Sequence, residues 1–204
     1  MKRFLRKHEG YSWLLGMYMI IAILMLMLMV MSWYRVSGDS EIAEDKITAS
    51  ALGSMLYDRP SYALDNEPVI SEFVKRNCEN YNSLCSLLSA NFGYENIPYG
   101  MNGINVAGFR IKSTDAYLLG GEATIYLPRV IYYCKNPQNG KWMIHEYTGN
   151  GTGVTKRGLE QTSTPVSPDG TVIEKTSCYV ELVYPVRFMG VAYDSIKSMT
   201  VALT

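Results

Sequence analysis

The sequence predicts an α+β fold that is attached to a membrane by one N-terminal helix. Two patterns carry this prediction. Residues 10–34 form a stretch of 25 residues without a charged side chain, whereas the chain from residue 104 onward alternates apolar residues with small or polar ones. The first pattern has the length of a membrane-spanning helix, and the second is typical of half-buried strands. We therefore expect an antiparallel sheet of four to six strands with a helix across one face.

The apolar stretch matches a bilayer in length. Its core from Trp13 to Tyr34 would be about 33 Å long as a helix, against a hydrocarbon thickness of roughly 30 Å. Aromatic residues stand at both ends, as interfacial anchors do. A cleavable secretory signal has a shorter apolar core and small residues at its cleavage site, whereas this stretch ends in bulky side chains. We therefore expect residues 11–34 to be a retained transmembrane helix.

The distribution of charge predicts the orientation of this helix. Residues 1–10 carry four basic side chains and one acidic one, a net charge of +3 in a chain that is neutral overall. Basic residues flanking a span favour the cytoplasmic side. We therefore expect a cytoplasmic leader at residues 1–10, the lipid bilayer as a partner, and an extracytoplasmic location for residues 35–204. The neutral total leaves no basic patch for nucleic acid.

A second helical pattern follows the span. Residues 40–58 read as a helix with Ser40 as its N-cap and acidic residues in its first turn. Apolar residues recur along it at helical spacing and form one stripe: Ala43, Ile47, Ala51, Leu52, Met55 and Leu56. Residues 36–39 predict a kink or break before it. The segment 35–58 is therefore expected to be a juxtamembrane helix packed on the sheet.

The junction between leader and span resembles that of type IV pilin-like proteins. Their short basic leader ends in Gly and is cut there by a prepilin peptidase, and here Gly10 and Tyr11 stand at that junction. The family usually has Glu at the fifth mature position, where this chain has Leu15, as some minor pilins and pseudopilins also depart from Glu. The arrangement is most similar to the TadE-like proteins of tight-adherence pili. The resemblance covers residues 1 to about 58.

This resemblance implies a structural role for the chain. The implied function is that of a minor pilin or pseudopilin-like subunit of a pilus or secretion apparatus. The implied partners are the prepilin peptidase, other pilin-like subunits and a membrane assembly platform. The alternative is an unprocessed single-pass anchor with an extracellular binding domain, for example a secretion or conjugation component, in which Gly10 is incidental.

Residues 59–204 are expected to form one extracytoplasmic α+β domain. Short helices are predicted at residues 67–77 and 82–92, the second of which stops at Gly93. Residues 136–140 predict a turn, residues 148–170 a long loop, and Tyr184–Pro185 an interruption between strands. The expected strands are residues 104–111, 123–134, 141–147, 171–183 and 195–203.

Four cysteines lie outside the span. An even number on the oxidising side of a membrane predicts a disulfide framework with three possible pairings. Cys78 and Cys85 are close in sequence, and Cys134 and Cys178 both belong to predicted strands. The preferred pairing is therefore 78–85 with 134–178. A metal site is disfavoured because the chain has no C-x-x-C spacing.

The sequence predicts no catalytic residue and no cofactor. His145 and Glu146 are neighbours in a predicted strand, so their side chains should point to opposite faces of the sheet. The Gly-rich run at residues 149–158 lacks the order of a phosphate-binding loop and precedes no clear helix. We therefore expect a protein that is not an enzyme.

Overall fold

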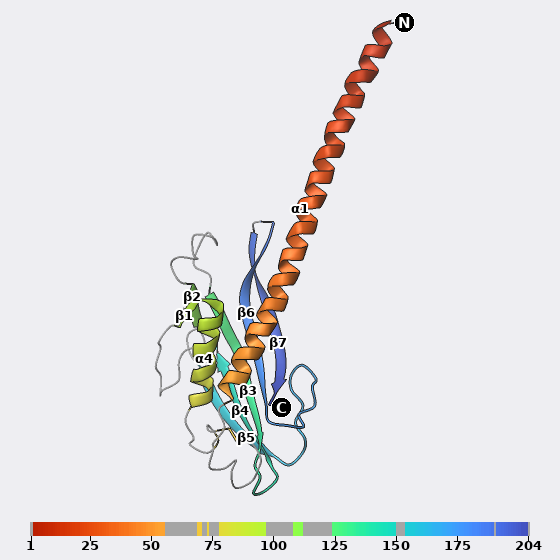
Figure 1. Ribbon diagram of the computed structural model, residues 1–204. Helices are drawn as coiled ribbons and strands as arrows, with labels where there is room; N and C mark the ends of the chain where they lie inside the picture. The colour runs from red at the N-terminus through yellow and green to blue at the C-terminus, as the bar shows by residue number, and fades with distance from the viewer. Residues whose placement is uncertain are drawn as a thin grey trace. The chain divides into compact units, whose positions relative to one another are not determined.

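A computed structural model describes residues 2–55, 69, 70, 73, 78–96, 108–111, 124–149, 154–189 and 191–203 (Figure 1). The described chain is of the α+β class, with a long apolar N-terminal helix followed by an antiparallel sheet. Its helices are α1 (Lys2–Ser54) and α4 (Glu79–Phe92). Its strands are β1 (Tyr94–Asn96), β2 (Gly108–Ile111), β3 (Thr124–Lys135), β4 (Trp142–Gly149), β5 (Val154–Gln161), β6 (Ser177–Phe188) and β7 (Val191–Ala202).

The chain divides into two compact units. One unit contains residues 1–41 and 186–193, which are the first part of α1 and the turn between β6 and β7. The other contains residues 42–185 and 194–204, which include the end of α1, α4 and most of the sheet.

Helix α1 is uninterrupted through residues 36–39, where the sequence predicted a break. The prediction of a break was wrong, and Ser40 is an internal helical residue instead of an N-cap. Gly38 is the main helix-weakening residue in this segment, and one glycine costs only about 1 kcal/mol relative to alanine. A helix of 53 residues tolerates that cost because each residue on either side continues the hydrogen-bond ladder.

Apolar side chains near the end of α1 are buried. Ala43, Ile47 and Ala51 belong to the helix and Met55 follows it directly. Polar side chains are buried on the same side of the helix. The Ser54 hydroxyl lies 3.1 Å from the hydroxyl of Tyr132 on β3, and the Asn80 side-chain amide of α4 donates to the Ser54 carbonyl at 2.7 Å.

The sheet contains seven described strands, more than the four to six predicted. The order β1-β2-β3-β4-β5 forms one path, and β6 pairs with both β3 and β7. The pairings of β1 with β2, β2 with β3, β3 with β4, β3 with β6, and β4 with β5 are antiparallel. Strand β3 is therefore central, with β4 along its second half on one side and β6 on the other.

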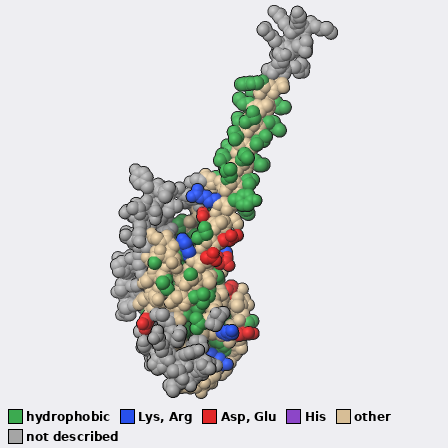
Figure 2. Space-filling view, in the orientation of Figure 1, with side chains coloured by type: hydrophobic (Ala, Val, Ile, Leu, Met, Phe, Trp, Pro, Cys, Tyr) green, Lys and Arg blue, Asp and Glu red, His purple; other side chains and the backbone are tan. Residues whose placement is uncertain are grey.

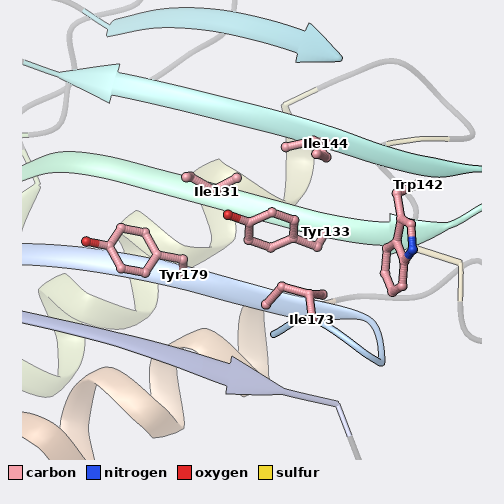
Figure 3. Packing of buried hydrophobic residues seen from close by; sticks show 6 residues of the cluster. All are labelled: Ile131, Tyr133, Trp142, Ile144, Ile173 and Tyr179. Atoms are coloured by element: carbon pink, nitrogen blue, oxygen red, sulfur yellow. The ribbon is translucent and has the colours of Figure 1, made fainter. Parts of the chain in front are cut away.

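The two faces of the sheet are covered differently. Alternation along β3 and β4 directs Tyr132 and Tyr147 to the face of the helices, where Tyr147 stacks on Tyr81 of α4 at 4.4 Å between ring centroids. The opposite face carries an apolar cluster that is closed by Ile173 from the segment between β5 and β6 (Figure 3). Its other members are Ile131, Tyr133, Trp142, Ile144 and Tyr179.

Several predicted boundaries in the sheet were wrong. The strand predicted from residue 171 begins only at Ser177, and the one predicted from residue 195 begins already at Val191. Residues 154–161, expected within a long loop, form β5, because the backbone of this polar edge strand pairs with β4 from Trp142 to Gly149. Strand β6 also continues through Pro185 to Phe188. The last residue pair between β3 and β6 is Tyr126–Val183, so Pro185 lies beyond the β3 ladder, where no N–H is needed for that pairing.

Other predicted elements lie where the sequence placed them. Helix α4 covers residues 82–92 and ends at Gly93, whose φ of 73° is the left-handed conformation that favours glycine. Strands β3 and β4 follow the predicted ranges closely, and their turn ends at Gly140. Most of the predicted helix 67–77 and the first half of the predicted strand 104–111 lie outside the described residues, and the second half of that strand is β2.

Candidate functional site

The first part of α1 is the most distinctive surface of the molecule. Every large apolar side chain from Trp13 to Tyr34 is exposed, and these two terminal aromatic residues are each 73% exposed. Figure 2 shows apolar side chains along this part of the helix. Among the described residues, α1 is the one helix long and apolar enough to cross a membrane. Such a surface is stable in hydrocarbon and costly in water, so α1 is a candidate single-pass anchor.

The residues of the predicted processing site lie in α1. Gly10 and Tyr11 are both helical and precede Trp13, the first exposed apolar side chain among those the structure describes. Gly16 lies one and a half turns further along, and an added Cβ there would meet no atom within 4 Å.

The structure contradicts the predicted disulfide between Cys78 and Cys85. All four cysteines are present as thiols. Cys78 is the N-cap residue of α4 and Cys85 lies inside the helix, seven residues later. Seven residues of helix separate their Cα atoms by about 10 Å, and a disulfide needs less than about 7 Å. The helix therefore keeps the two thiols apart.

The sheet register explains why Cys134 and Cys178 are not joined either. Cys178 of β6 is opposite Tyr132 of β3, so Cys134 lies two residues further along the neighbouring strand. Side chains in this diagonal relation have Cβ atoms roughly 7 Å apart, against about 4 Å in a disulfide. The Thr176 hydroxyl instead donates to the Cys134 sulfur at 3.9 Å.

The thiol of Cys85 is protonated and unreactive. Cys85 and its neighbour Tyr81 are fully buried on the inner face of α4. Burial raises the pKa of the Cys85 thiol to about 12, and burial also raises the pKa of the Tyr81 hydroxyl. Both groups therefore remain protonated near neutral pH, which suits a packing role.

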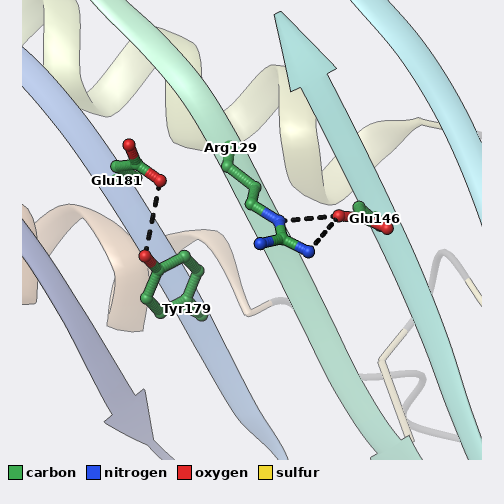
Figure 4. Close-up of polar contacts among 4 residues, drawn as sticks. All are labelled: Arg129, Glu146, Tyr179 and Glu181. Atoms are coloured by element: carbon green, nitrogen blue, oxygen red, sulfur yellow. Dashed lines mark hydrogen bonds and ion pairs between the residues drawn. The ribbon is translucent and has the colours of Figure 1, made fainter. Parts of the chain in front are cut away.

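His145 and Glu146 lie on opposite faces of the sheet, as the alternation of a strand predicts. The His145 ring stacks on Phe73 at 3.9 Å between centroids. Glu146 accepts a hydrogen bond from Arg129 of β3 at 2.6 Å on the other face (Figure 4). The two neighbours therefore form no acid–base pair with each other.

Figure 4 also shows Tyr179 beside Glu181 on β6. The Tyr179 hydroxyl donates to the Glu181 carboxylate at 3.4 Å. Burial and the adjacent Glu181 charge both raise the pKa of Tyr179, so its hydroxyl remains a proton donor near neutral pH. The Arg129–Glu146 contact joins two strands, and the Tyr179–Glu181 contact lies within one strand. Both contacts suit a structural role.

A pocket of about 610 Å³ opens beside His145 on the helix side of the sheet. Sequence reasoning missed it, because Cys78 reaches it from a segment more than 60 residues earlier in the chain than His145. Its volume is in the range of small-molecule sites. Its lining is Phe73, Cys78, Asn136, Met143, His145, Lys156, Gly158, Leu159 and Glu160.

A hydrogen-bonded turn fixes the segment that closes the other face. Asp169 accepts hydrogen bonds from the Ser167 hydroxyl, from the Thr171 backbone N–H at 3.0 Å, and from the Thr200 hydroxyl of β7 at 2.6 Å. Partial burial alone would raise the pKa of Asp169, but these hydrogen bonds outweigh it and lower the pKa to about 2. The ionised carboxylate therefore ties the turn to β7.

Across the described part of the chain, no group of three histidine, cysteine or acidic side chains is arranged to hold a metal ion. Comparisons with known proteins add no assignment: no family model, no curated protein and no solved structure matches the chain.

Proposed function

We propose that the chain is a membrane-anchored structural subunit of the pilin-like type, a minor pilin or pseudopilin of a pilus or secretion apparatus. The observation that carries the proposal is the division of α1 into two chemically different parts. The part from Trp13 to Tyr34 exposes its apolar side chains, whereas Ala43, Ile47 and Ala51 are buried. One helix thus offers a lipid-facing surface and a core-facing stripe, which suits a subunit that is stored in a membrane before assembly.

Packing of the juxtamembrane helix against the sheet is part of this proposal. It is supported by the contact of Ser54 with Tyr132 and by an ion pair between Glu44 and Lys197 of β7 at 2.8 Å. The Asn91 amide of α4 also donates to the Ser50 hydroxyl at 2.8 Å. These contacts support a helix that is part of the domain, and a force on the anchor would then act on the domain directly.

The proposed processing step is hydrolysis of the peptide bond between Gly10 and Tyr11 by a prepilin peptidase. Mass spectrometry of the chain extracted from membranes of cells with that peptidase should find Tyr11 as the first residue. Gly10→Leu should retain Met1 in the mature protein, and Gly16→Ala is the matched control because a Cβ at Gly16 meets no neighbour. An intact Met1 in the parent chain would overturn the proposal of processing.

The second candidate is an unprocessed anchor that carries a binding domain. The pocket beside His145 favours it, since the pocket combines an aromatic wall from Phe73 with polar groups from Lys156 and Glu160. Ligand-dependent thermal stabilisation of the full chain in detergent would support this candidate. Loss of that stabilisation in His145→Ala would locate the ligand in this pocket.

A further inference from the structure

Apolar side chains are exposed in the turn between β6 and β7 and along the first part of β7. Met189 is 50% exposed, Val191 67%, Tyr193 44% and Ile196 66%. The six residues from Phe188 to Tyr193 include no charge. These side chains make the hairpin tip a candidate interaction surface, which needs further observations because small apolar patches are common on protein surfaces.

The backbone conformation of Met189 supports the hypothesis that the hairpin tip is an interaction surface. Met189 has a φ of 51° and is the only residue other than glycine with a positive φ among those the structure describes. Glycine, asparagine or aspartate would occupy such a position in a two-residue hairpin turn with less strain. A methionine here is costly for the turn and buries little within the chain, so its side chain is better explained by an external apolar partner.

Within the second unit, the end of α1 and the later part of β7 run in the same direction. Glu44 pairs with Lys197 at 2.8 Å, and the Thr48 hydroxyl lies 3.6 Å from the sulfur of Met199. From Lys197 back to Val191, six strand residues cover about 20 Å. The same length corresponds to about 13 helical residues before Glu44. This count brings Val191 level with the Met31–Tyr34 end of the apolar stretch.

The division into compact units agrees with this count. Residues 186–193 group with residues 1–41 and not with the rest of the sheet. Trp33 and Tyr34 are the aromatic residues expected at the membrane–water boundary. The exposed tip of the hairpin is therefore at the depth of the same boundary.

We propose that the β6–β7 tip, formed by Met189, Val191 and Tyr193, inserts into the headgroup region of the bilayer that α1 spans. The proposal rests on the anchoring part of the proposed function. The partner is lipid, because the tip shares its level with the interfacial aromatics of α1 and presents methionine, valine and tyrosine without charge. Tyrosine suits this depth, since its ring is apolar and its hydroxyl can remain in water. The hairpin would then be a second membrane contact.

Depth-dependent quenching tests this proposal in the full chain. The protein is reconstituted in vesicles of phosphatidylcholine and phosphatidylglycerol, and an environment-sensitive fluorophore is attached to Val191→Cys in a Cys78→Ser background. The remaining three cysteines are buried. Nitroxide lipids with the label near the headgroup should quench this probe at least about twofold more strongly than a solvent-exposed probe, as expected for a tip that lies in the interface. Aqueous iodide should quench it less.

Two matched probes make every outcome decisive. Gln138→Cys lies in the exposed β3–β4 turn and should respond only to iodide, and Met25→Cys lies within the apolar stretch and should respond to deep nitroxide lipids. If Met25 is quenched by lipid but Val191 behaves as Gln138 does, the hairpin proposal fails and the anchor stands. If the Met25 probe is not quenched by lipid, anchoring itself fails. If Val191 is shielded from both quenchers, a protein covers the tip and the lipid proposal is wrong.

Discussion

At the scale of single residues, a few buried polar groups determine how the end of α1 meets the domain. The Tyr132 hydroxyl donates to the Asn80 carbonyl at 3.1 Å and lies at the same distance from the Ser54 hydroxyl. All three residues are fully buried. Hydrogen bonds of this kind contribute modestly when they form, but an unsatisfied partner left behind in the interior is expensive. The network therefore favours one seating of the helix over others.

Removing the Tyr132 hydroxyl should destabilise the protein. Tyr132→Phe leaves the Asn80 carbonyl and the Ser54 hydroxyl without this partner, so the free energy of unfolding should fall by about 1–3 kcal/mol. Denaturant unfolding of the full chain in detergent measures this change. Tyr193→Phe is the control, because this half-exposed hydroxyl can bond to water, and it should leave stability unchanged. An unchanged Tyr132→Phe would contradict the role of the network.

The carboxylate of Asp169 should make stability depend on acid pH. Its pKa is about 2 in the folded chain, below the ordinary value of 3.8. A lowered pKa means that the stabilisation is fully present above about pH 4 and is lost as the pH falls towards 2. Unfolding measured between pH 6 and pH 2 should show this loss in the parent chain and less of it in Asp169→Asn. Glu174→Gln, which removes an exposed carboxylate from the same segment, should retain the acid loss seen in the parent.

At the scale of elements, α1 is one helix with two environments. Ile47 is fully buried, whereas Ile42 is 54% exposed, although only five residues separate them. An isoleucine side chain therefore contributes differently to the free energy of unfolding on the two faces of one helix. In the proposed packing, this buried stripe would attach the helix to the domain, and the face with Ile42 would stay exposed.

This difference between two isoleucines gives a matched test. Ile47→Ala should lower the free energy of unfolding by about 2–5 kcal/mol, because it removes buried methylenes and leaves a cavity. Ile42→Ala should change stability by no more than about 0.5 kcal/mol. Thermal unfolding of both variants in detergent would check this, and equal effects would show that the stripe is not a packed face of the domain.

The helices were easier to predict from the sequence than the strands and the site. The uncharged stretch and the spacing of Ala43, Ile47 and Ala51 follow from local periodicity, which the sequence displays directly. Strand β5 was missed because its run of charged and small residues carries no apolar alternation, and its pairing with β4 comes from backbone bonds. The stack of Phe73 on His145 depends on residues 72 positions apart, a proximity that no local pattern contains.

At the scale of the whole molecule, charge at the N-terminus is expected to set the topology. Lys2, Arg3, Arg6 and Lys7 precede the apolar stretch, and Arg35 is the nearest basic residue after it. This asymmetry favours a cytoplasmic N-terminus. The domain at residues 35–204 would then lie on the opposite side of the membrane.

Replacing the four basic leader residues with glutamine should therefore weaken the orientation. Protease protection in membrane vesicles of known sidedness would detect an increased fraction of chains with the domain on the cytoplasmic side. Glutamine in place of Lys135 and Lys141, far from the span in sequence, is the control and should leave the orientation unchanged. A domain found on the cytoplasmic side in the parent chain would reverse the predicted topology.

The contact of β7 with α1 also has a consequence for the order of folding. Thr48 and Met199 meet although 151 residues separate them, so the first element of the chain to emerge is completed by the last. Closing so long a loop is slow, and if the domain is exported as proposed, it cannot begin until residues 191–202 have left the export machinery. A chain stalled during such export would hold the stripe around Ile47 partly uncovered beside the membrane. It would then need a chaperone until β7 arrived.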